Sequence, residues 1–146
     1  AAGARHLARP LHNSLAKPPH GRANGTEHTL IMSDTLFGIH GAALEVRSHR
    51  MGVLTSNIAN AATPGYKAQD IDFGRALQAR LAGADGETAV GSATLYRRPV
   101  MSSLDGNTVE MATEQASFAE NAVGYSATLG FLRGRVETVT RAIKGE

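Results

Sequence analysis

The sequence contains no cysteine and no tryptophan, and only 5% of its 146 residues are aromatic. Without cysteine, the chain has neither disulfide bonds nor thiolate metal ligands. The shortage of large side chains, together with 16 glycines, argues against a compact enzyme core and favours an extended helical protein of one domain at most. No apolar run approaches the roughly 18 residues of a membrane span, and none has the form of a secretory signal.

The sequence also lacks a strong excess of either charge, because its net charge is +2 at pH 7. Four basic residues against Glu27 give residues 1–31 a charge of +3, which leaves −1 for residues 32–146. The larger part therefore has no basic surface typical of nucleic-acid binding, and the basic arm has no accompanying nucleic-acid fold motif.

Residues 1–31 combine prolines, glycines and scattered basic groups without a sustained period, which predicts a disordered extension. Met32-Ser33-Asp34 resembles a natural start, so we expect the extension to be translated upstream sequence or a remnant of cloning. The extension also contains four histidines, His6, His12, His20 and His28. A metal site is one interpretation, but chance spacing is favoured because no carboxylate or thiolate partners accompany them.

A helix is predicted from about Thr35 to Asn60, capped by Ser33 or Asp34. One apolar stripe of this helix comprises Phe37, Leu44, Met51, Leu54 and Ile58. A second stripe comprises Leu36, Ile39, Ala43, Val46 and Val53. A surface helix of a monomer needs only one apolar face, so two stripes predict neighbours on both sides.

The predicted helix ends in the run Asn57-Ile58-Ala59-Asn60-Ala61-Ala62-Thr63-Pro64-Gly65-Tyr66-Lys67. Thr63 precedes a proline and is therefore disfavoured in the helical region, while Pro64-Gly65 favours a turn. Asn57 and Asn60 lie three residues apart on one face, and we expect both to cap the helix end.

This run resembles the N-terminal motif of the bacterial flagellar rod and hook proteins, Asn-x-x-Asn-x-x-Thr-Pro-Gly-Tyr. Its counterparts here are Asn57, Asn60, Thr63, Pro64, Gly65 and Tyr66. Asp105, Gly106, Asn107 and Val109 are similar to the family's Asp-Gly-Asn-x-Val turn, which opens the C-terminal helix. The short segment between the two motifs resembles that of proximal rod members. The resemblance covers residues 33–146.

The resemblance implies a structural subunit of the proximal rod of the flagellar basal body. Such a subunit would assemble through its terminal helices into a helical tube that surrounds the export channel and transmits torque. Its implied partners are further copies, other rod subunits and the basal-body base on the MS-ring and export-gate side. Its implied location is the periplasmic rod, reached through the flagellar type III apparatus. The motif amides would contact adjacent subunits, and no cofactor, metal, nucleic acid or small-molecule substrate is expected.

The middle segment, residues 67–104, loses helical periodicity, although residues 75–81 can form a short helix and Thr88–Tyr96 one or two short strands. Asp70 and Asp72 suggest an acid–base pair, but a solvated helix N-terminus is favoured because no third partner is visible. Arg97-Arg98 is interpreted as solvated rather than as a contact for an acidic partner.

The C-terminal helix, predicted over residues 111–144, has the strongest periodicity of the chain and would span roughly 50 Å. One file repeats every seven residues through Met111, Phe118, Tyr125, Leu132 and Val139. A second file runs in step through Gln115, Ala122, Leu129, Val136 and Ile143. Together they predict an a/d seam. Gly124, Gly130 and Gly134 weaken the helix, which should therefore depend on packing.

The predicted fold is all-α, with two long terminal helices forming an antiparallel coiled-coil hairpin joined by an irregular middle segment. Its parts are the disordered extension 1–31, the N-terminal helix and motif 32–66, the middle segment 67–104 and the C-terminal helix 105–146. The second apolar face of the N-terminal helix is expected to stay unfilled, which favours assembly. A freestanding coiled-coil adaptor is the alternative, whereas an enzyme is disfavoured because no set of catalytic roles is present.

Overall fold

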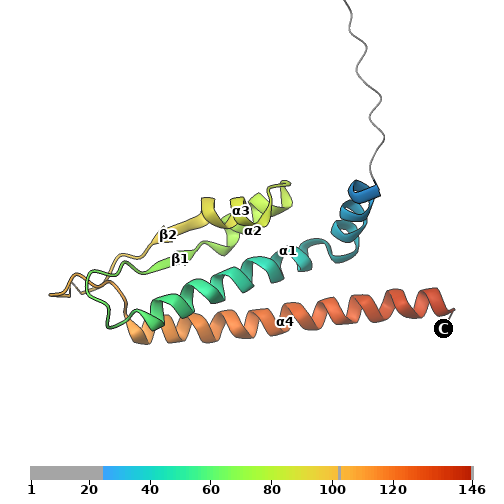
Figure 1. The fold of residues 1–146 in the computed structure, drawn as a ribbon. Helices are drawn as coiled ribbons and strands as arrows, with labels where there is room; N and C mark the ends of the chain where they lie inside the picture. Colours follow the sequence, from blue (N-terminus) through green and yellow to red (C-terminus); the bar gives the residue numbers. More distant parts are fainter. Residues whose placement is uncertain (1–24, 102, 146) are drawn as a thin grey trace, which may run out of the picture.

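The computed structural model describes residues 25–101 and 103–145, with side chains from Phe37 onward. Two long antiparallel helices dominate it, α1 (Gly25–Ala59) and α4 (Met111–Lys144), and they pack side by side (Figure 1). The elements between them are β1 (Gln69–Ile71), α2 (Phe73–Leu81), α3 (Gly86–Ala93) and β2 (Thr94–Tyr96). The protein is therefore mainly α-helical, as predicted.

Helix α1 begins earlier than predicted, at Gly25 instead of Thr35, so residues 25–31 are helical and do not belong to a disordered extension. The remaining prediction for the extension concerns residues 1–24 and the four histidine side chains, which lie outside the described residues. Gly38 interrupts the helix with φ 47° and ψ −138°, a conformation that is accessible essentially only to glycine. Figure 1 shows α1 changing direction at this point.

The middle segment is more ordered than predicted. Asp72 caps α2 by accepting a hydrogen bond from the N–H of Arg75, as expected for a carboxylate at a helix N-terminus. The prediction of strands from Thr88 onward is wrong for residues 88–93, because Asp85 accepts a hydrogen bond from the N–H of Thr88 and starts α3 there. Only Thr94–Tyr96 forms a strand, which pairs antiparallel with β1.

The middle segment covers one face of α1. Its buried core comprises Val46, Ile71, Ala76 and Ala93, with Val53, Phe73 and Val90 packed against them. The central part of the second apolar stripe of α1 is therefore covered within the chain, and the expectation that this stripe stays free is wrong for Ala43, Val46 and Val53. Ile39 remains 51% exposed. Helix α1 is the central layer, with α4 on one side and the middle segment on the other (Figure 1).

The interface between α1 and α4 has a polar centre. The fully or almost fully buried side chains of α4 are Glu114, Asn121 and Thr128. The predicted seam residues that flank this file and are half-buried are Phe118, Ala122, Tyr125, Leu129, Leu132 and Val139. Those that are exposed are Met111, Gln115, Val136 and Ile143. On α1, Leu54 is buried, while Phe37, Leu44, Met51 and Ile58 are half-buried. The centre of the contact within the chain thus differs from the predicted seam.

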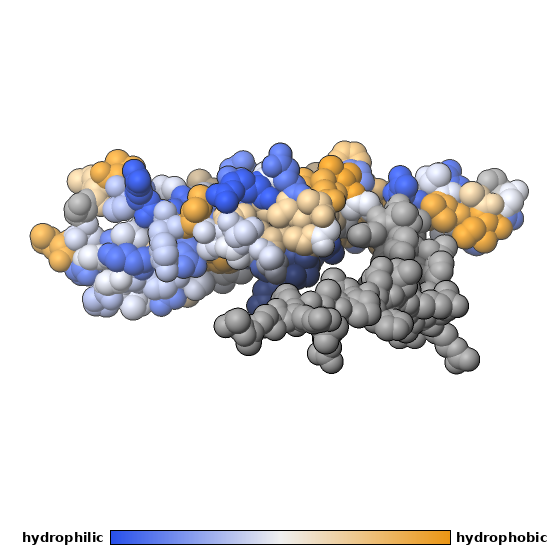
Figure 2. All heavy atoms as spheres, turned by 90° about the horizontal axis from the view of Figure 1, so that it is seen from above, coloured by the Kyte–Doolittle hydropathy of each residue, from blue (hydrophilic) through white to orange (hydrophobic). Residues whose placement is uncertain are grey.

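Exposed apolar side chains gather at both ends of the long axis (Figure 2). At the loop end they belong to the segment between β2 and α4, where Val100 is 87% exposed and Met101 81%. At the opposite end they belong to the C-terminal part of α4, where Ile143 is 81% exposed. No helix in the part of the chain that the structure describes is long and apolar enough to cross a membrane.

Candidate functional site

The two sequence motifs bind each other at the loop end of the molecule. We call this contact the motif junction, formed by residues 57–67 and 105–109. The N–H of Gly65 donates to the carbonyl of Asp105 at 2.9 Å. Further bonds across the junction run from Thr108 N to Tyr66 O (3.0 Å), from Ala68 N to Thr108 Oγ1 (2.8 Å) and from Lys67 Nζ to Gly106 O (2.6 Å). Motifs that lie about forty residues apart in sequence thus form one structural unit.

Asn107 lies at the centre of the junction and is 6% exposed. Its Nδ2 donates to the carbonyls of Asn60, Ala61 and Thr63 at 3.1, 2.9 and 2.9 Å. Its Oδ1 accepts from the N–H of Val109 at 2.7 Å. The carbonyls at a helix C-terminus have no partner within the helix, so this one amide caps the end of α1 from the other motif.

The glycines of both motifs adopt φ 73°, at Gly65 and at Gly106, a value that suits glycine in a tight turn. Asp105 stabilises the second turn through its Oδ1, which accepts from the hydroxyl of Ser103 and from the N–H of Asn107. These two hydrogen bonds hold the pKa of the Asp105 carboxyl below its ordinary value.

The two asparagines of the first motif have different roles. Asn60 caps the helix as predicted, because its Nδ2 donates to the carbonyl of Ser56 at 2.8 Å and its Oδ1 accepts from the hydroxyl of Thr63 at 3.2 Å. The same expectation for Asn57 is wrong. Asn57 is fully buried, and its side chain bonds to other elements rather than to the end of α1.

Asn57 connects α1 to both of its neighbours. Its Nδ2 donates to the carbonyl of Gln69 in β1 at 2.7 Å and to Oε2 of Glu114 in α4 at 2.9 Å. Its Oδ1 accepts from the N–H of Gln69 and from the Tyr66 hydroxyl, both at 3.2 Å. One side chain therefore fixes the position of β1 and α4 relative to α1.

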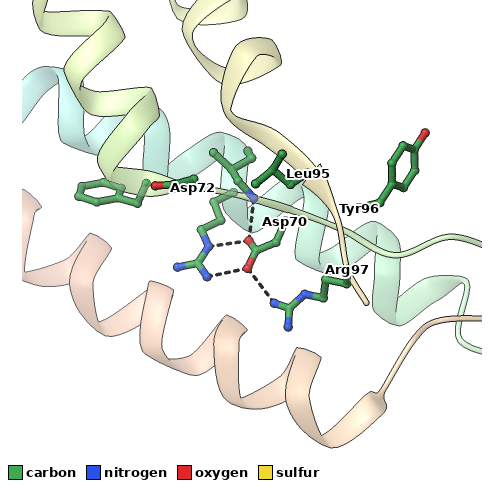
Figure 3. Close-up of a pocket in the computed structure, with 8 residues that line it drawn as sticks. Asp70, Asp72, Leu95, Tyr96 and Arg97 are labelled. Atoms are coloured by element: carbon green, nitrogen blue, oxygen red, sulfur yellow. Dashed lines mark hydrogen bonds and ion pairs between the residues drawn. The ribbon is translucent and has the colours of Figure 1, made fainter. Parts of the chain in front are cut away.

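Asp70 forms an ion-pair cluster beside this contact (Figure 3). Nε and Nη2 of Arg50 each lie 2.8 Å from one oxygen of Asp70, and Nη2 of Arg97 lies 2.8 Å from Oδ2. Burial alone would raise the pKa of Asp70, but the hydrogen bonds and charge of Arg50, the N–H of Ile71 and the charge of Arg97 lower it below its ordinary value. The hydrogen bond to Asp70 raises the pKa of Arg50. The interpretation of Asp70 and Arg97 as solvated is therefore wrong.

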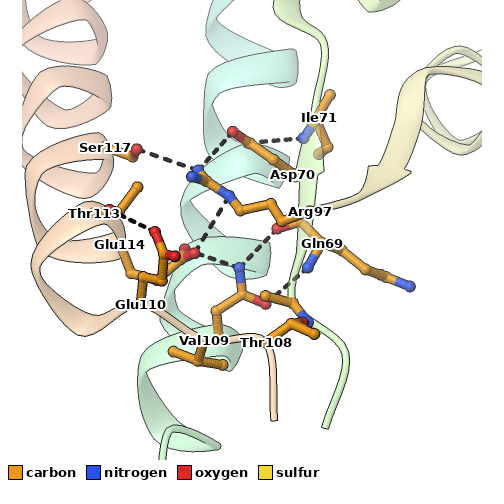
Figure 4. Close-up of polar contacts among 12 residues, drawn as sticks. Gln69, Asp70, Ile71, Arg97, Thr108, Val109, Glu110, Thr113, Glu114 and Ser117 are labelled. Carbon is orange, nitrogen blue, oxygen red and sulfur yellow. Dashed lines mark hydrogen bonds and ion pairs between the residues drawn. The ribbon is translucent and has the colours of Figure 1, made fainter. Parts of the chain in front are cut away.

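Arg97 also reaches α4 (Figure 4). Its Nε lies 3.2 Å from Oε1 of Glu114, an ion pair whose angles do not satisfy a hydrogen bond. Its Nη2 donates to the hydroxyl of Ser117 at 3.2 Å. Glu114 is fully buried, and a buried carboxylate needs such a charged partner because leaving water is costly. Arg97 thus holds β2 against both β1 and α4.

A second polar contact lies further along the helix pair. Nδ2 of Asn121 donates to the carbonyl of Arg47 at 2.9 Å, while its Oδ1 has no hydrogen-bond partner among the residues that the structure describes. The guanidinium of Arg47 lies 4.3 Å from the ring centroid of Phe73. A Cβ at Gly124 would come within 2.3 Å of Nη1 of Arg47, so this glycine makes room for the Arg47 side chain.

These contacts organise the subunit and offer no set of catalytic roles. The carboxylates of Asp70 and Glu114 are both paired with arginines, and within the described ranges no three His, Asp or Glu side chains gather as a metal site would require. Sequence reasoning missed Arg50, Glu114 and Asn121. The available signal was the spacing of Glu114, Asn121 and Thr128, which repeats every seven residues alongside the apolar files.

The comparisons with known proteins agree with the two motifs. Residues 38–67, which end in the first motif, match the family model described as flagella basal body rod protein. The flagellar basal body rod protein FlgB of Cereibacter sphaeroides is 52% identical over 122 residues, which cover 75% of this chain and 94% of that protein. The FlgB proteins of Aeromonas hydrophila and Escherichia coli K12 are 39% and 36% identical, and the alignments cover 98% and 94% of their lengths and 80% and 76% of this chain.

The chain belongs to the FlgB family of flagellar basal body rod proteins. As a FlgB-family protein, it is a structural subunit of the rod in the flagellar basal body and not an enzyme. The alternative of a freestanding coiled-coil adaptor is therefore not supported. The polar contacts described above hold this structural subunit together.

Proposed function

We propose that the subunit assembles in the proximal rod through α1 and α4, forming part of a helical tube around the export channel that transmits torque. The observation that supports this most is the uncovered C-terminal part of α4. The rings of His40 and Phe131 stack with centroids 5.5 Å apart, close to the point where α1 turns at Gly38. Beyond it, Val136 is 42% exposed and Ile143 81%.

The heptad files of α4 continue through this uncovered part. The residues that we assign to a coiled-coil seam completed by neighbouring subunits are Leu129, Leu132, Val136, Val139 and Ile143. Burying such apolar side chains contributes about 1.5–3 kcal/mol each, so assembly gains what the isolated chain leaves in water. Contacts between different surfaces of like subunits build an open helix when the rotation between them does not close.

The motif junction is the second surface that we assign to assembly. Thr63, Pro64, Gly65 and Asp105 remain exposed after the two motifs have bound each other. Their backbone is held rigid by the Asn107 amide and the hydrogen bonds across the junction. A rigid, exposed turn is suited to contact a neighbour, because little further entropy is lost on binding.

We assign its neighbours to further copies, other rod subunits and the basal-body base on the MS-ring and export-gate side. Export to the periplasmic rod through the flagellar type III apparatus requires an unfolded chain. Glycines within α4 lower its intrinsic helix propensity by about 0.8–1 kcal/mol each relative to alanine. Such a helix depends on packing and would order fully only in the assembly.

The test is electron microscopy of cell envelopes from a deletion strain, with and without a plasmid that supplies the full chain. We expect basal bodies without rod and hook in the deletion strain, and complete rods when the chain is supplied. Normal flagella in the deletion strain would contradict the assignment to the rod. Cross-linking of the supplied chain to neighbouring rod subunits would identify its position.

A further inference from the structure

We propose that Glu114 and Asn121 set the register in which α4 packs on α1, so that one alignment of the two helices is selected over alignments shifted by a heptad. We call these two residues the register pair. This inference goes beyond rod assembly and does not depend on it, because it concerns the packing of two helices within one chain.

Apart from the motif junction, which also holds the start of α4 beside the end of α1, the apolar residues leave the register of the two helices open. On α1, Leu44, Met51 and Ile58 repeat every seven residues, and the files of α4 repeat with the same period. Moving α4 along α1 by seven residues therefore places apolar side chains opposite apolar side chains again. A single buried polar residue fixes the register in coiled coils for this reason, since only its contacts change when the helices slide.

The two members of the register pair require opposite partners. The Glu114 carboxylate only accepts hydrogen bonds, and its surroundings provide donors: Nδ2 of Asn57 at 2.9 Å and the charge on Nε of Arg97 at 3.2 Å. The place of Asn121 provides an acceptor, the carbonyl of Arg47, to which its amide donates at 2.9 Å. Both side chains are fully buried, so neither can replace a lost partner with water.

A shift by one heptad breaks this complementarity in either direction. In one direction Glu114 moves toward the place of Asn121 and meets the carbonyl of Arg47, where acceptor faces acceptor and a buried charge is unpaired. In the other direction Asn121 takes the place of Glu114, and Arg97 loses its carboxylate. Thr128 is the next residue of this file, but it contributes little to the choice between registers, because its hydroxyl donates to the carbonyl of Gly124 in its own helix.

Cysteine cross-linking of the full chain tests the proposal, and the absence of native cysteine makes the readout clean. His40→Cys with Phe131→Cys reports the observed register, because these two rings stack in the structure. A shift by one heptad brings residue 138 or residue 124 opposite residue 40. His40→Cys with Thr138→Cys reports the first shift. His40→Cys with Tyr125→Cys reports the second, because Tyr125 directly follows Gly124, where a Cβ would clash with Arg47. A short bis-maleimide joins each pair, and the ratio of native to shifted cross-linking is compared between backgrounds.

We expect Glu114→Leu to lower this ratio by roughly tenfold or more, because the shifted alignments no longer bury an unpaired carboxylate. Glu114→Gln should lower it less, by about threefold, since the amide keeps an acceptor but loses the charge that Arg97 requires. Glu120→Leu, at an exposed position of α4, is the matched control and should leave the ratio unchanged.

A general loss of stability would not produce this order of cross-linking ratios among the variants. Glu114→Leu leaves Asn57 and Arg97 without their carboxylate partner and should lower the free energy of unfolding, but this loss does not by itself favour one alignment over another. Retained helicity with a lowered ratio is therefore the signature of a register function. An unchanged ratio in folded Glu114→Leu would overturn the proposal. If that variant does not fold, Glu114→Gln decides, and an unchanged ratio there would overturn the proposal equally.

Discussion

The two halves of α4 have the same heptad spacing, but one half is packed within the subunit and the other is partly exposed. Residues 111–128 present a polar file to α1, and each member of that file finds a partner within the chain. Residues 129–144 present apolar side chains, of which Val136 and Ile143 remain exposed. The first half is thus specified by contacts inside the subunit, whereas the second half must find its partners elsewhere.

Charge divides the helix in the same way. The first half contains two glutamates and no basic residue, whereas the second contains three arginines and a lysine against Glu137. Two of these basic residues, Arg141 and Lys144, lie in the last turn, where positive charge is favourable beside the helix C-terminus. A helix can therefore combine a self-contained half and an assembling half without any change in its period.

Of the variants that test this difference between the halves, Leu132→Asp is expected to have the largest effect, because it places a charge in the apolar half. A carboxylate buried in a seam without a partner costs several kcal/mol, so incorporation into rods should be abolished. The measurement is electron microscopy of basal bodies from a complemented deletion strain, together with motility in soft agar. Gln78→Asp, at an exposed position of α2, is the control and should assemble. Normal rods in the Leu132→Asp strain would show that the second half does not form the proposed seam.

Asn57→Ala should have the largest effect on the polar half. It removes the partner of a buried carboxylate and of the Gln69 backbone, and we expect a loss of about 2–4 kcal/mol in the free energy of unfolding. Asn60→Ala, three residues away, removes two exposed hydrogen bonds at the C-terminus of α1 and should cost about 0.5–1 kcal/mol. Urea denaturation followed by circular dichroism measures both. Equal losses would contradict the different roles of the two asparagines.

Asp70→Asn should cost about 1–3 kcal/mol at pH 7, because the cluster loses its charge but keeps its shape. The pKa of Asp70 lies below its ordinary value in the folded chain, so the folded state binds fewer protons than the unfolded state. The stabilisation is therefore complete above the unfolded pKa of about 4 and is lost as the pH falls through the folded pKa.

Thermal unfolding of the wild type and of Asp70→Asn between pH 7 and pH 2 measures how the stabilisation by Asp70 depends on pH. Arg50 contributes no slope, because its raised pKa keeps it charged throughout. A difference between wild type and Asp70→Asn that stayed constant down to pH 2 would contradict the assignment.

The smallest effect is expected when residues 1–31 are removed and the chain starts at Met32. Neither half of α4 loses a described contact in this truncation, so motility in soft agar and rod assembly should equal those of the full chain. The truncation also removes residues 25–31 of α1. Reduced motility would therefore show that residues 1–31 take part in assembly.

Sequence reasoning predicted the features that depend on local chemistry. Helix period, the turn at Pro64-Gly65 and a helix N-terminus at Asp72 follow from the preferences of a few neighbouring residues, and the structure has all three. That the Asp72 side chain caps α2 was not predicted. The short helix over residues 75–81 was also expected and lies within α2. The family resemblance could be identified because both motifs are local runs of residues.

The features that were missed depend on distant partners. Glu114 and Asn121 look like solvent positions in a hydrophobic pattern, because their partners Asn57, Arg97 and the Arg47 backbone are far away in sequence. We expected the second apolar stripe of α1 to face another subunit. The elements that cover it are hard to predict, since strands β1 and β2 are only three residues long and give a weak pattern. No local rule shows that such short elements fold back onto α1.

The Asn107 amide has a consequence for the order in which the chain folds. It supplies the hydrogen bonds that close the end of α1, yet it lies 44 to 47 residues further along the chain than the carbonyls it binds. The last turn of α1 therefore lacks these three hydrogen bonds until residue 107 is in place. Completion of α1 thus depends on the segment that directly precedes α4 in the sequence.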